Sequence, residues 1–334
     1  MPLMASQTWP RELEVALAVV RETALAARAW QEEVAHGAFL KADQSPVTIA
    51  DFVVQTVVAE RLAEQFPDDP LVAEEDSLPL LGNNARPLRA RTLAIARRLL
   101  PAIDEEQLLA AIDRGKGSPD VRFWTLDPID GTQGFVRGGQ FVVALALVER
   151  GTPRIGLLGC PRWPGPSFLG VPSDSGVVVF AASGRGAFAA PLAGAGGARP
   201  IHVSSAREPR RARILRSFDS RHIDANAFDR ILAALNVNEP PMLMDSQAKH
   251  AVLASGEADL MIRTVARPGF HDTIWDQAAG ALIIEEAGGR VTDLRGAGLD
   301  FSVGRTLSRN DGFVASNGHL HGAALDAIRA ALSH

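Results

Sequence analysis

The stretch Trp124-Thr-Leu-Asp127-Pro-Ile-Asp130-Gly-Thr-Gln-Gly-Phe135 places two carboxylates and a glycine-rich turn directly after an apolar run. Magnesium and similar hard cations bind oxygen ligands, which the side chains of Asp127 and Asp130 and the carbonyl of Ile129 can supply. Backbone amides from Gly131 onward would face a phosphoryl group if they open a short helix. The stretch therefore predicts a metal-assisted phosphate site, although Asp-Pro and Asp-Gly pairs also occur in ordinary turns.

The size and charge of the chain narrow the class of protein. With 334 residues it is too long for one ordinary compact core, so we expect two domains or two lobes. The formal net charge of -5 gives no reason to expect a nucleic acid polymer or a membrane surface as partner. Cys160 is the single cysteine, which excludes an internal disulfide, and no export signal or apolar run of ~18 residues is apparent. We therefore expect a cytoplasmic protein.

Periodicity and turn residues predict alternating helices and strands along the chain. A Gly/Ala-rich stretch at 190–200 is typical of a linker, so we predict an N-terminal lobe at 1–199 and a C-terminal lobe at 200–334. The predicted helices lie at 11–36, 48–66, 225–235, 246–255 and 275–287, with one or two more between 80 and 120. The predicted strands lie at 71–73, 121–126, 141–148, 154–159, 176–182, 186–189, 201–204 and 259–263.

Further acidic residues precede the Asp-Pro stretch. Glu74, Glu75 and Asp76 follow a predicted strand, where their repulsion must be compensated by solvent or by a cation. A solvated acidic turn is the simpler interpretation of these three residues alone. Asp51 lies in the first helical turn after Thr48, where an acidic side chain complements the helix N-terminus, and catalysis is the alternative.

Polar residues of the second half could complete a site. Asp276 lies at the start of an apolar helix, where it can cap the helix, supply a metal ligand, or do both. Ser246 is placed to cap a helix, and Lys249 lies one turn further, where it either is solvated or pairs with an anion. Arg263, at a strand end, and His222 are ordinary surface candidates when each is considered alone.

Three motifs taken together resemble those of the magnesium-dependent, lithium-sensitive phosphatases that include inositol monophosphatase. They are Glu74-Glu75, Asp127-Pro-Ile-Asp130-Gly-Thr132 and Trp275-Asp276-Gln-Ala-Ala-Gly280, in the order and at the separations expected. The likeness runs from about Ser45 to Asn317 and so covers most of the chain. It implies an α/β layered sandwich of the inositol monophosphatase type, with an N-terminal α+β metal-binding lobe and a C-terminal α/β substrate lobe.

Two stretches are most similar to the 3'(2'),5'-bisphosphate nucleotidases within that superfamily. They are Gly131-Thr-Gln-Gly-Phe-Val-Arg-Gly138 and Asp245-Ser-Gln-Ala-Lys-His-Ala-Val-Leu-Ala254. Enzymes of this branch remove the 3'-phosphate from adenosine 3',5'-bisphosphate, a by-product of sulfate transfer. This sequence departs from them at Gln133, where relatives carry lysine, and at Asp219-Ser-Arg-His222, where a pair of histidines is expected.

The resemblance implies a role for each matching residue. One Mg²⁺ would be bound by Glu74, Asp127 and the Ile129 carbonyl, and a second by Asp127, Asp130 and Asp276. The catalytic residues that handle the attacking water and any third ion would be Asp51, Glu75 and Thr132. The nucleotide and its remaining phosphate would contact Gly131, Thr132, His222, Ser246, Lys249 and Arg263.

The resemblance thus implies a Mg²⁺-dependent phosphomonoesterase, monomeric or homodimeric, that hydrolyses the 3'-phosphate of adenosine 3',5'-bisphosphate to release AMP and phosphate, with its sulfated relative as a further substrate. One alternative is the same chemistry on inositol monophosphate or another sugar phosphate, because one metal platform serves many substrates. A second alternative is a catalytically idle protein that binds a nucleotide or a metal.

Overall fold

The computed structural model describes residues 9–35, 39–40, 46–163, 175–194, 196–218, 224–264 and 269–332. Its helices are α1 (Arg11–Ala35), α2 (Ile49–Gln65), α3 (Arg86–Ala96), α4 (Glu105–Asp113), α5 (Thr132–Val136), α6 (Ala225–Leu235), α7 (Ala248–Ala254), α8 (Ala278–Glu286) and α9 (His321–Leu332). Its strands are β1 (Phe39–Leu40), β2 (Pro46–Val47), β3 (Leu71–Ala73), β4 (Arg122–Asp130), β5 (Val142–Glu149), β6 (Thr152–Cys160), β7 (Val177–Ala182), β8 (Ala187–Pro191), β9 (Arg199–Ile201), β10 (Ile214–Arg216), β11 (Met242–Leu243), β12 (Leu260–Arg263), β13 (Arg290–Thr292) and β14 (Phe313–Ser316).

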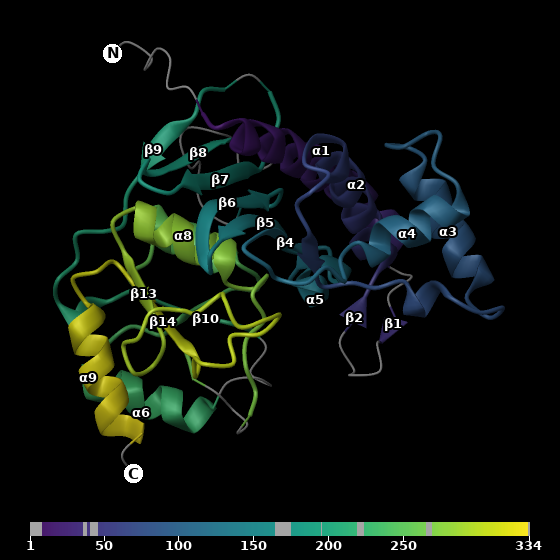
Figure 1. Cartoon of the computed structure of the whole chain (residues 1–334). Coiled ribbons are helices and arrows are strands. Elements are labelled where there is room, and N and C mark those ends of the chain that lie inside the picture. Colours follow the sequence, from purple (N-terminus) through teal and green to yellow (C-terminus); the bar gives the residue numbers. More distant parts are fainter. Residues whose placement is uncertain are drawn as a thin grey trace.

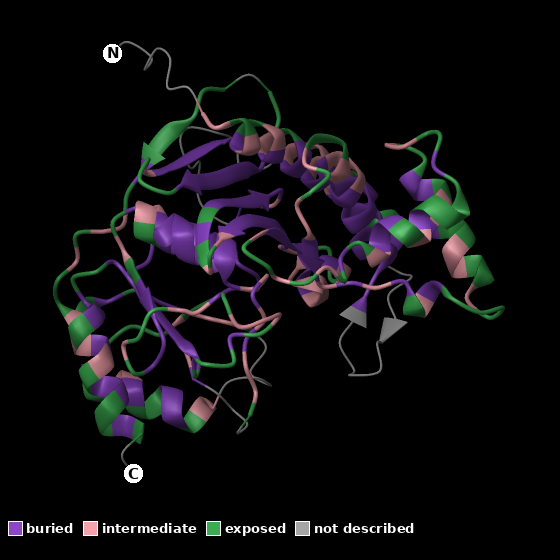
Figure 2. Ribbon diagram, viewed as in Figure 1, coloured by how far each residue is buried: buried purple, intermediate pink, exposed green. Residues whose placement is uncertain are grey.

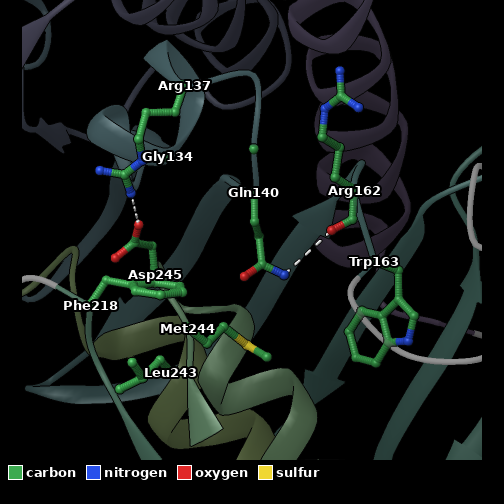
Figure 3. A pocket seen from close by; sticks show the side chains of 10 residues that line it. Gly134, Arg137, Gln140, Arg162, Trp163, Phe218, Leu243, Met244 and Asp245 are labelled. Atoms are coloured by element: carbon green, nitrogen blue, oxygen red, sulfur yellow. Dashed lines mark hydrogen bonds and ion pairs between the residues drawn. The ribbon is translucent and has the colours of Figure 1, made fainter.

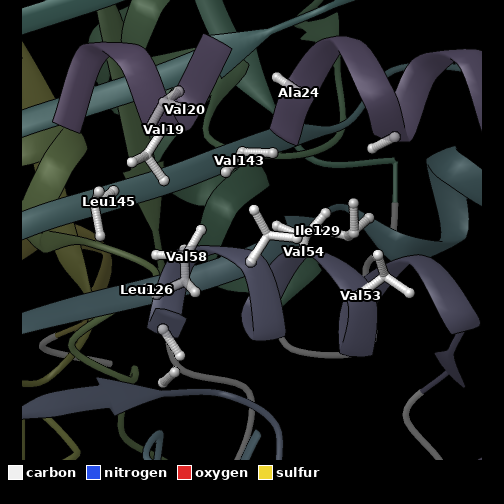
Figure 4. Packing of buried hydrophobic residues seen from close by; sticks show 14 of the residues in the cluster. Val19, Val20, Ala24, Val53, Val54, Val58, Leu126, Ile129, Val143 and Leu145 are labelled. Carbon is white, nitrogen blue, oxygen red and sulfur yellow. The ribbon is translucent and has the colours of Figure 1, made fainter. Parts of the chain in front are cut away.

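The first half of the chain builds a seven-stranded sheet covered on one face by α1 and α2 (Figure 1). The strands follow chain order from β3 to β9, with β3 and β4 parallel and the remaining pairs antiparallel. Alternate strand residues face these helices because side chains alternate across a strand. Figure 4 shows Val20 and Ala24 of α1 and Val54 of α2 in the same apolar cluster as Val143 and Leu145 of β5. This apolar layer fixes the sheet that carries the Asp-Pro stretch.

The second half adds a five-stranded sheet, in the order β11-β10-β12-β14-β13, with α8 packed between the two sheets (Figure 1). Residues 278–284 of α8 are all buried, as Figure 2 shows, because the helix has a sheet on each side. Helices α6 and α9 cover the outer face of the second sheet. The layers therefore alternate helix, sheet, helix, sheet, helix, and the predicted α/β layered sandwich is confirmed.

Two glycines let α8 approach its neighbours closely. A Cβ on Gly156 of β6 would lie 2.7 Å from the Ala279 carbonyl oxygen, and a Cβ on Gly280 would lie 2.4 Å from the His250 ring. Contacts this short are not found at real Cβ atoms, so larger residues would push α8 away from β6 and α7. The glycine that ends the third sequence motif therefore serves packing.

Several element boundaries differ from the predictions. Strand β4 continues past Leu126 to Asp130, and the helices predicted from 246 and 275 begin at Ala248 and Ala278. The strand predicted at 201–204 is β9, which lies earlier. Strands β10, β13 and β14 and helix α9 were not predicted from the sequence. The division at 199/200 stays a prediction, and β9 spans it. Among the described residues, no helix is both long and apolar enough to cross a membrane.

Candidate metal and phosphate site

A bulge at the end of β4 brings Asp127 and Asp130 to the same face of the sheet. Side chains alternate along a regular strand, so residues three apart would point to opposite faces. Here Asp127 pairs with Ala144 and Asp130 with Val142, so three steps on β4 oppose two on β5. Both partner residues belong to the core on the α8 side, and directly paired residues share a face. Both carboxylates therefore point toward the layer that contains Asp276.

Asp276 completes a group of three carboxylates. Oxygen atoms of Asp127, Asp130 and Asp276 all lie within 4.8 Å of one another. Asp127 is buried, whereas Asp130 and Asp276 are partly exposed, so the group is reachable from solvent. The predicted alternative that Asp276 caps α8 is wrong, because the N-cap residue is Gln277 and no side chain caps this helix. Asp276 lies before the helix, in the loop that faces β4.

The charges of these carboxylates oppose one another. Burial and the charges of Glu74 and Asp130 raise the pKa of Asp127 well above its usual range. Burial and the charge of Asp130 raise the pKa of Asp276 to about 7. A buried group of like charges with oxygen donors at this spacing fits a hard divalent cation, which would neutralise the repulsion. The residues present therefore fit a magnesium site.

The predicted acidic neighbours surround this group. Glu74 follows β3, and its backbone N–H donates to the Leu126 carbonyl at 3.2 Å, which places it beside β4. Its negative charge raises the pKa of Asp127, Asp130 and Asp276. The next residue, Glu75, is 3% exposed. The interpretation of Glu74 and Glu75 as a merely solvated turn is therefore wrong.

Asp51 and Glu75 are held in place by polar contacts of α2. Asp51 is fully buried, and its Oδ2 accepts hydrogen bonds from the backbone N–H and the hydroxyl of Thr48, each at 2.7 Å. The predicted helix-capping role of Asp51 is confirmed. Its charge also raises the pKa of Asp127, so it lies near the carboxylate group. The Gln55 amide donates to the Glu75 carbonyl at 2.7 Å and accepts from the Glu75 N–H at 3.0 Å.

The turn after Asp130 leads into the short helix α5, so the backbone amides from Gly131 onward do open a helix. Its N-cap Gly131 has φ 87°, a left-handed conformation that favours glycine. A Cβ at Gly131 would lie 2.9 Å from the Cβ of Ser246, so the lack of a side chain also allows close contact with the second lobe. The Thr132 hydroxyl donates to the Ile129 carbonyl at 3.1 Å, which joins two residues of the predicted metal and water site.

Among the predicted substrate residues of the second half of the chain, Ser246 lies against this turn, and Lys249 is bonded to Ser246. The Lys249 side chain is buried, and its Nζ donates to the carbonyls of Ser246 at 2.8 Å and Met244 at 3.3 Å. Burial lowers the pKa of Lys249 to about 8, and the interpretation as a solvated lysine is wrong. Arg263 forms an ion pair of 3.1 Å with Asp272, and its charge lowers the pKa of Asp276.

Ser246 and His222 are the remaining predicted substrate residues. The Ser246 hydroxyl accepts a hydrogen bond from the Ala248 N–H at 3.2 Å, but the N-cap residue of α7 is Gln247, so the prediction that Ser246 is the helix cap is wrong. Ser246 has φ 65°, a conformation uncommon for a residue with a side chain. His222 lies outside the described residues.

Gln247 is a site residue that the sequence analysis missed. Its backbone N–H donates to Oδ2 of Asp130, and its side-chain amide donates to the Trp275 carbonyl at 3.0 Å. The only signal in the sequence is its position between Ser246 and Lys249. A buried glutamine in that position is ordinary in a helix start, so the pattern alone could not assign this role.

A cavity of about 400 Å³ lies beside Gly134 of α5 and Arg137, which follows this helix (Figure 3). Its walls include Phe218, Met244 and Gly134, and an ion pair between Arg137 and Asp245 closes one side. Asp245 and Met244 immediately precede Ser246, whose Cβ lies close to Gly131.

The layered fold and the carboxylate group next to a glycine turn define the class of metal-dependent α/β phosphatases. The sequence profile of the inositol monophosphatase family matches residues 11–333, and the chain belongs to this family. The family predicted from the three motifs is therefore confirmed.

Relatives from several organisms are similar over nearly the whole chain. A 3'(2'),5'-bisphosphate nucleotidase of Schizosaccharomyces pombe is 36% identical, covering 91% of this chain and 89% of the relative. One of Emericella nidulans is 35% identical, covering 97% and 99%. Among solved structures, an IMPase of Thermotoga maritima matches with a TM-score of 0.67 at 20% identity, covering 97% and 99%. This last likeness shows the fold.

Proposed function

We propose that the protein is a Mg²⁺-dependent phosphomonoesterase that converts adenosine 3',5'-bisphosphate to AMP and phosphate, with the sulfated relative as a second substrate. The observation that carries the proposal is the meeting of Asp127, Asp130 and Asp276 within 4.8 Å beside the glycine turn. The names of the similar relatives support the nucleotide as substrate. A cytoplasmic location, inhibition by lithium and a place in sulfur metabolism belong to the same proposal.

Two sets of ligands would hold two magnesium ions. A third ion at the same site is part of the proposal. Glu74, Asp127 and the Ile129 carbonyl form one set, and Asp127, Asp130 and Asp276 form the other. When bound, magnesium lowers the pKa of a coordinated water and stabilises charge on the phosphoryl oxygens. Asp127 belongs to both sets, which agrees with its full burial among the other acidic groups.

The chain's own residues would orient the phosphate and the water. The backbone amides of Gly131 and Thr132, at the start of α5, favour a phosphoryl group there. The Thr132 hydroxyl donates to the Ile129 carbonyl, so its oxygen lone pairs remain to accept a hydrogen bond from the water and orient it. Asp51 and Glu75 are the proposed proton acceptors, and the contacts of Thr48 and Gln55 fix their positions.

Lys249 and Arg263 would bind the remaining 5'-phosphate. Carbonyl acceptors orient the Lys249 ammonium without neutralising its charge, and its pKa of about 8 keeps it mostly protonated at pH 7. Arg263 is half-buried beside Asp272, and its charge reaches both Asp276 and Lys249. Cations in this position suit an anionic group that lies next to the reacting phosphate.

The test is phosphate release by the purified protein in magnesium, with adenosine 3',5'-bisphosphate or inositol 1-phosphate as substrate, with and without lithium. We expect preference for the bisphosphate and inhibition by lithium. Preference for inositol 1-phosphate would contradict the nucleotide proposal, and bisphosphate binding in a calorimeter without turnover would indicate an idle binder.

A variant of Lys249 tests the substrate contact separately. Lys249→Met should raise KM for the bisphosphate about tenfold or more, because a hydrogen bond to a charged group contributes about 1.5–3 kcal/mol. The exposed Lys116, paired with Asp113, provides the control Lys116→Met, for which no change is expected. An unchanged KM in Lys249→Met would remove Lys249 from the proposed substrate contacts.

A further inference from the structure

Trp275, the residue before Asp276, is anchored at two separate points. Its carbonyl oxygen accepts a hydrogen bond from the side-chain amide of Gln247 at 3.0 Å. Its ring lies under the guanidinium of Arg305, whose Cζ is 4.8 Å from the ring centroid. Because the carbonyl and the ring of Trp275 are fixed independently, the peptide that leads to Asp276 has little freedom to move.

The first anchor connects Asp276 to Asp130. Gln247 is 3% exposed, and its backbone N–H donates to Oδ2 of Asp130 while its side chain reaches Trp275. One residue thus contacts the carboxylate from the first lobe and the peptide that carries the carboxylate from the second. Nε2 of His250, in α7, lies 3.3 Å from Oε1 of Gln277. This contact joins the start of α8 to the helix that begins directly after Gln247.

The second anchor connects Asp276 to the end of β3. The guanidinium of Arg305 donates to the carbonyl of Ala73, directly before Glu74, and to the carbonyl of Gly115 at 3.0 Å. The carbonyl of Arg305 also accepts from the Ile274 N–H at 3.0 Å. The cation therefore bonds backbone oxygens and an aromatic face, and the carboxylates keep their charge for a metal ion.

We propose that Gln247 and Arg305 are positioning residues that hold Asp276 at a fixed separation from Asp130 and Glu74. The carboxylates come from three distant segments and repel one another, so a preformed metal site needs contacts that oppose this repulsion. Gln247 and Arg305 provide such contacts through one residue, Trp275. The inference rests on the proposed function only for the identity of the ion.

The experiment measures magnesium binding without substrate. Purified full-length protein, freed of metal, is melted at increasing Mg²⁺ concentrations, and the rise in Tm gives an apparent Kd. Gln247→Ala and Arg305→Met should each weaken magnesium binding about tenfold to a hundredfold, as expected when residues that orient ligands are removed. In activity assays, kcat should recover at high magnesium, because the ligands themselves remain.

Matched controls separate positioning from general loss of stability. Gln140→Ala removes an amide that donates to the Arg162 carbonyl at 3.4 Å, and Arg28→Met removes a guanidinium that donates to the Pro161 carbonyl at 3.2 Å. Both should keep the magnesium affinity of the unmodified protein. If Arg305→Met fails to fold, Arg305→Lys retains the charge but loses the forked donors, and it should weaken binding less.

The outcomes distinguish this inference from the proposed function. Magnesium affinity unchanged in both variants, with Tm lowered only as in the controls, would overturn the positioning role. Weakened magnesium binding would support it even if the protein released no phosphate from the bisphosphate. That second result would contradict only the proposed substrate.

Discussion

Two of the regions in which aspartates are buried treat the negative charge in opposite ways. Asp259, 1% exposed at the start of the second sheet, accepts hydrogen bonds from Arg213 through the backbone N–H at 2.8 Å and through the guanidinium at 2.7 and 3.0 Å. The hydroxyl of Ser204 donates to it as well. Between β4 and α8, by contrast, Asp127 and Asp276 face further carboxylates.

The pKa values follow these partners. Burial alone would raise the pKa of Asp259, but the hydrogen bonds from Arg213 and Ser204 outweigh it, and the pKa lies below its usual range. Burial and like charges raise the pKa of Asp127 and of Asp276. One carboxylate is neutralised inside the protein and serves the fold. The others face like charges that raise their pKa, and groups perturbed in this way are common at functional sites.

The largest expected effect comes from removing one charge at the site. Asp127→Asn should lower kcat about a thousandfold or more, because metal-bound charge stabilisation contributes several kcal/mol to the barrier. Asp259→Asn should leave the activity of each folded molecule nearly unchanged. Phosphate release in saturating magnesium measures both. If the activity of Asp127→Asn stayed within tenfold of that of the unmodified protein, the functional contrast between Asp127 and Asp259 would be contradicted.

The second-largest expected effect is on stability and comes from changing Asp259. Asp259→Asn should lower the free energy of unfolding by about 2 kcal/mol, less than the 3–5 kcal/mol of a fully buried pair because the Arg213 side chain is 45% exposed. The exposed pair of Asp326 and Arg329 gives the control Asp326→Asn, with an expected change near zero. Urea unfolding at pH 7 measures both variants, and equal effects would contradict the structural role of Asp259.

The contribution of Asp259 should depend on pH. Its pKa is lower in the folded than in the unfolded protein, so its stabilisation is present above the unfolded pKa of about 3.9 and is lost as pH falls through the folded pKa. The difference in unfolding free energy between the unmodified protein and Asp259→Asn should therefore be constant from pH 6 to 8 and shrink below about pH 4. A difference that grows at low pH would contradict this sign.

The sequence predicted those parts of the site that depend on local pattern. Asp127, Asp130 and the turn at Gly131 lie within five residues of one another, so their proximity is visible in the sequence. The bulge that turns both aspartates to one face was not predictable, because it appears only when β4 is paired with β5. Helix α9 was not predicted, although the sequence contains the helical spacing of apolar residues at Ala324, Ala327, Ile328 and Ala331.

The contacts that assemble the site could not be read from the sequence. Arg305 bonds the carbonyl of Gly115, 190 residues earlier, and Gln247 contacts Asp130, 117 residues earlier. Such contacts depend on how the two sheets pack around α8, and no local periodicity encodes that packing. For the same reason the burial of Lys249 was missed, since a lysine one turn into a helix is usually solvated.

The smallest expected effect has the opposite sign to that at Asp259. Asp276→Asn should stabilise the metal-free protein by about 1 kcal/mol, because it removes one of several repelling charges from a site built for function. In EDTA at pH 8 this corresponds to a rise in Tm of about 2 °C.

Added magnesium should reverse the order of the Tm values of the unmodified protein and Asp276→Asn. The unmodified protein should gain Tm with added Mg²⁺, whereas Asp276→Asn has lost a ligand and should gain little, so the two titration curves cross. The neutral substitution isolates charge from packing, since asparagine keeps nearly the same shape as aspartate. If Asp276→Asn were instead less stable than the unmodified protein in EDTA, Asp276 would be balanced within the protein as Asp259 is, and the contrast between the two regions would fail.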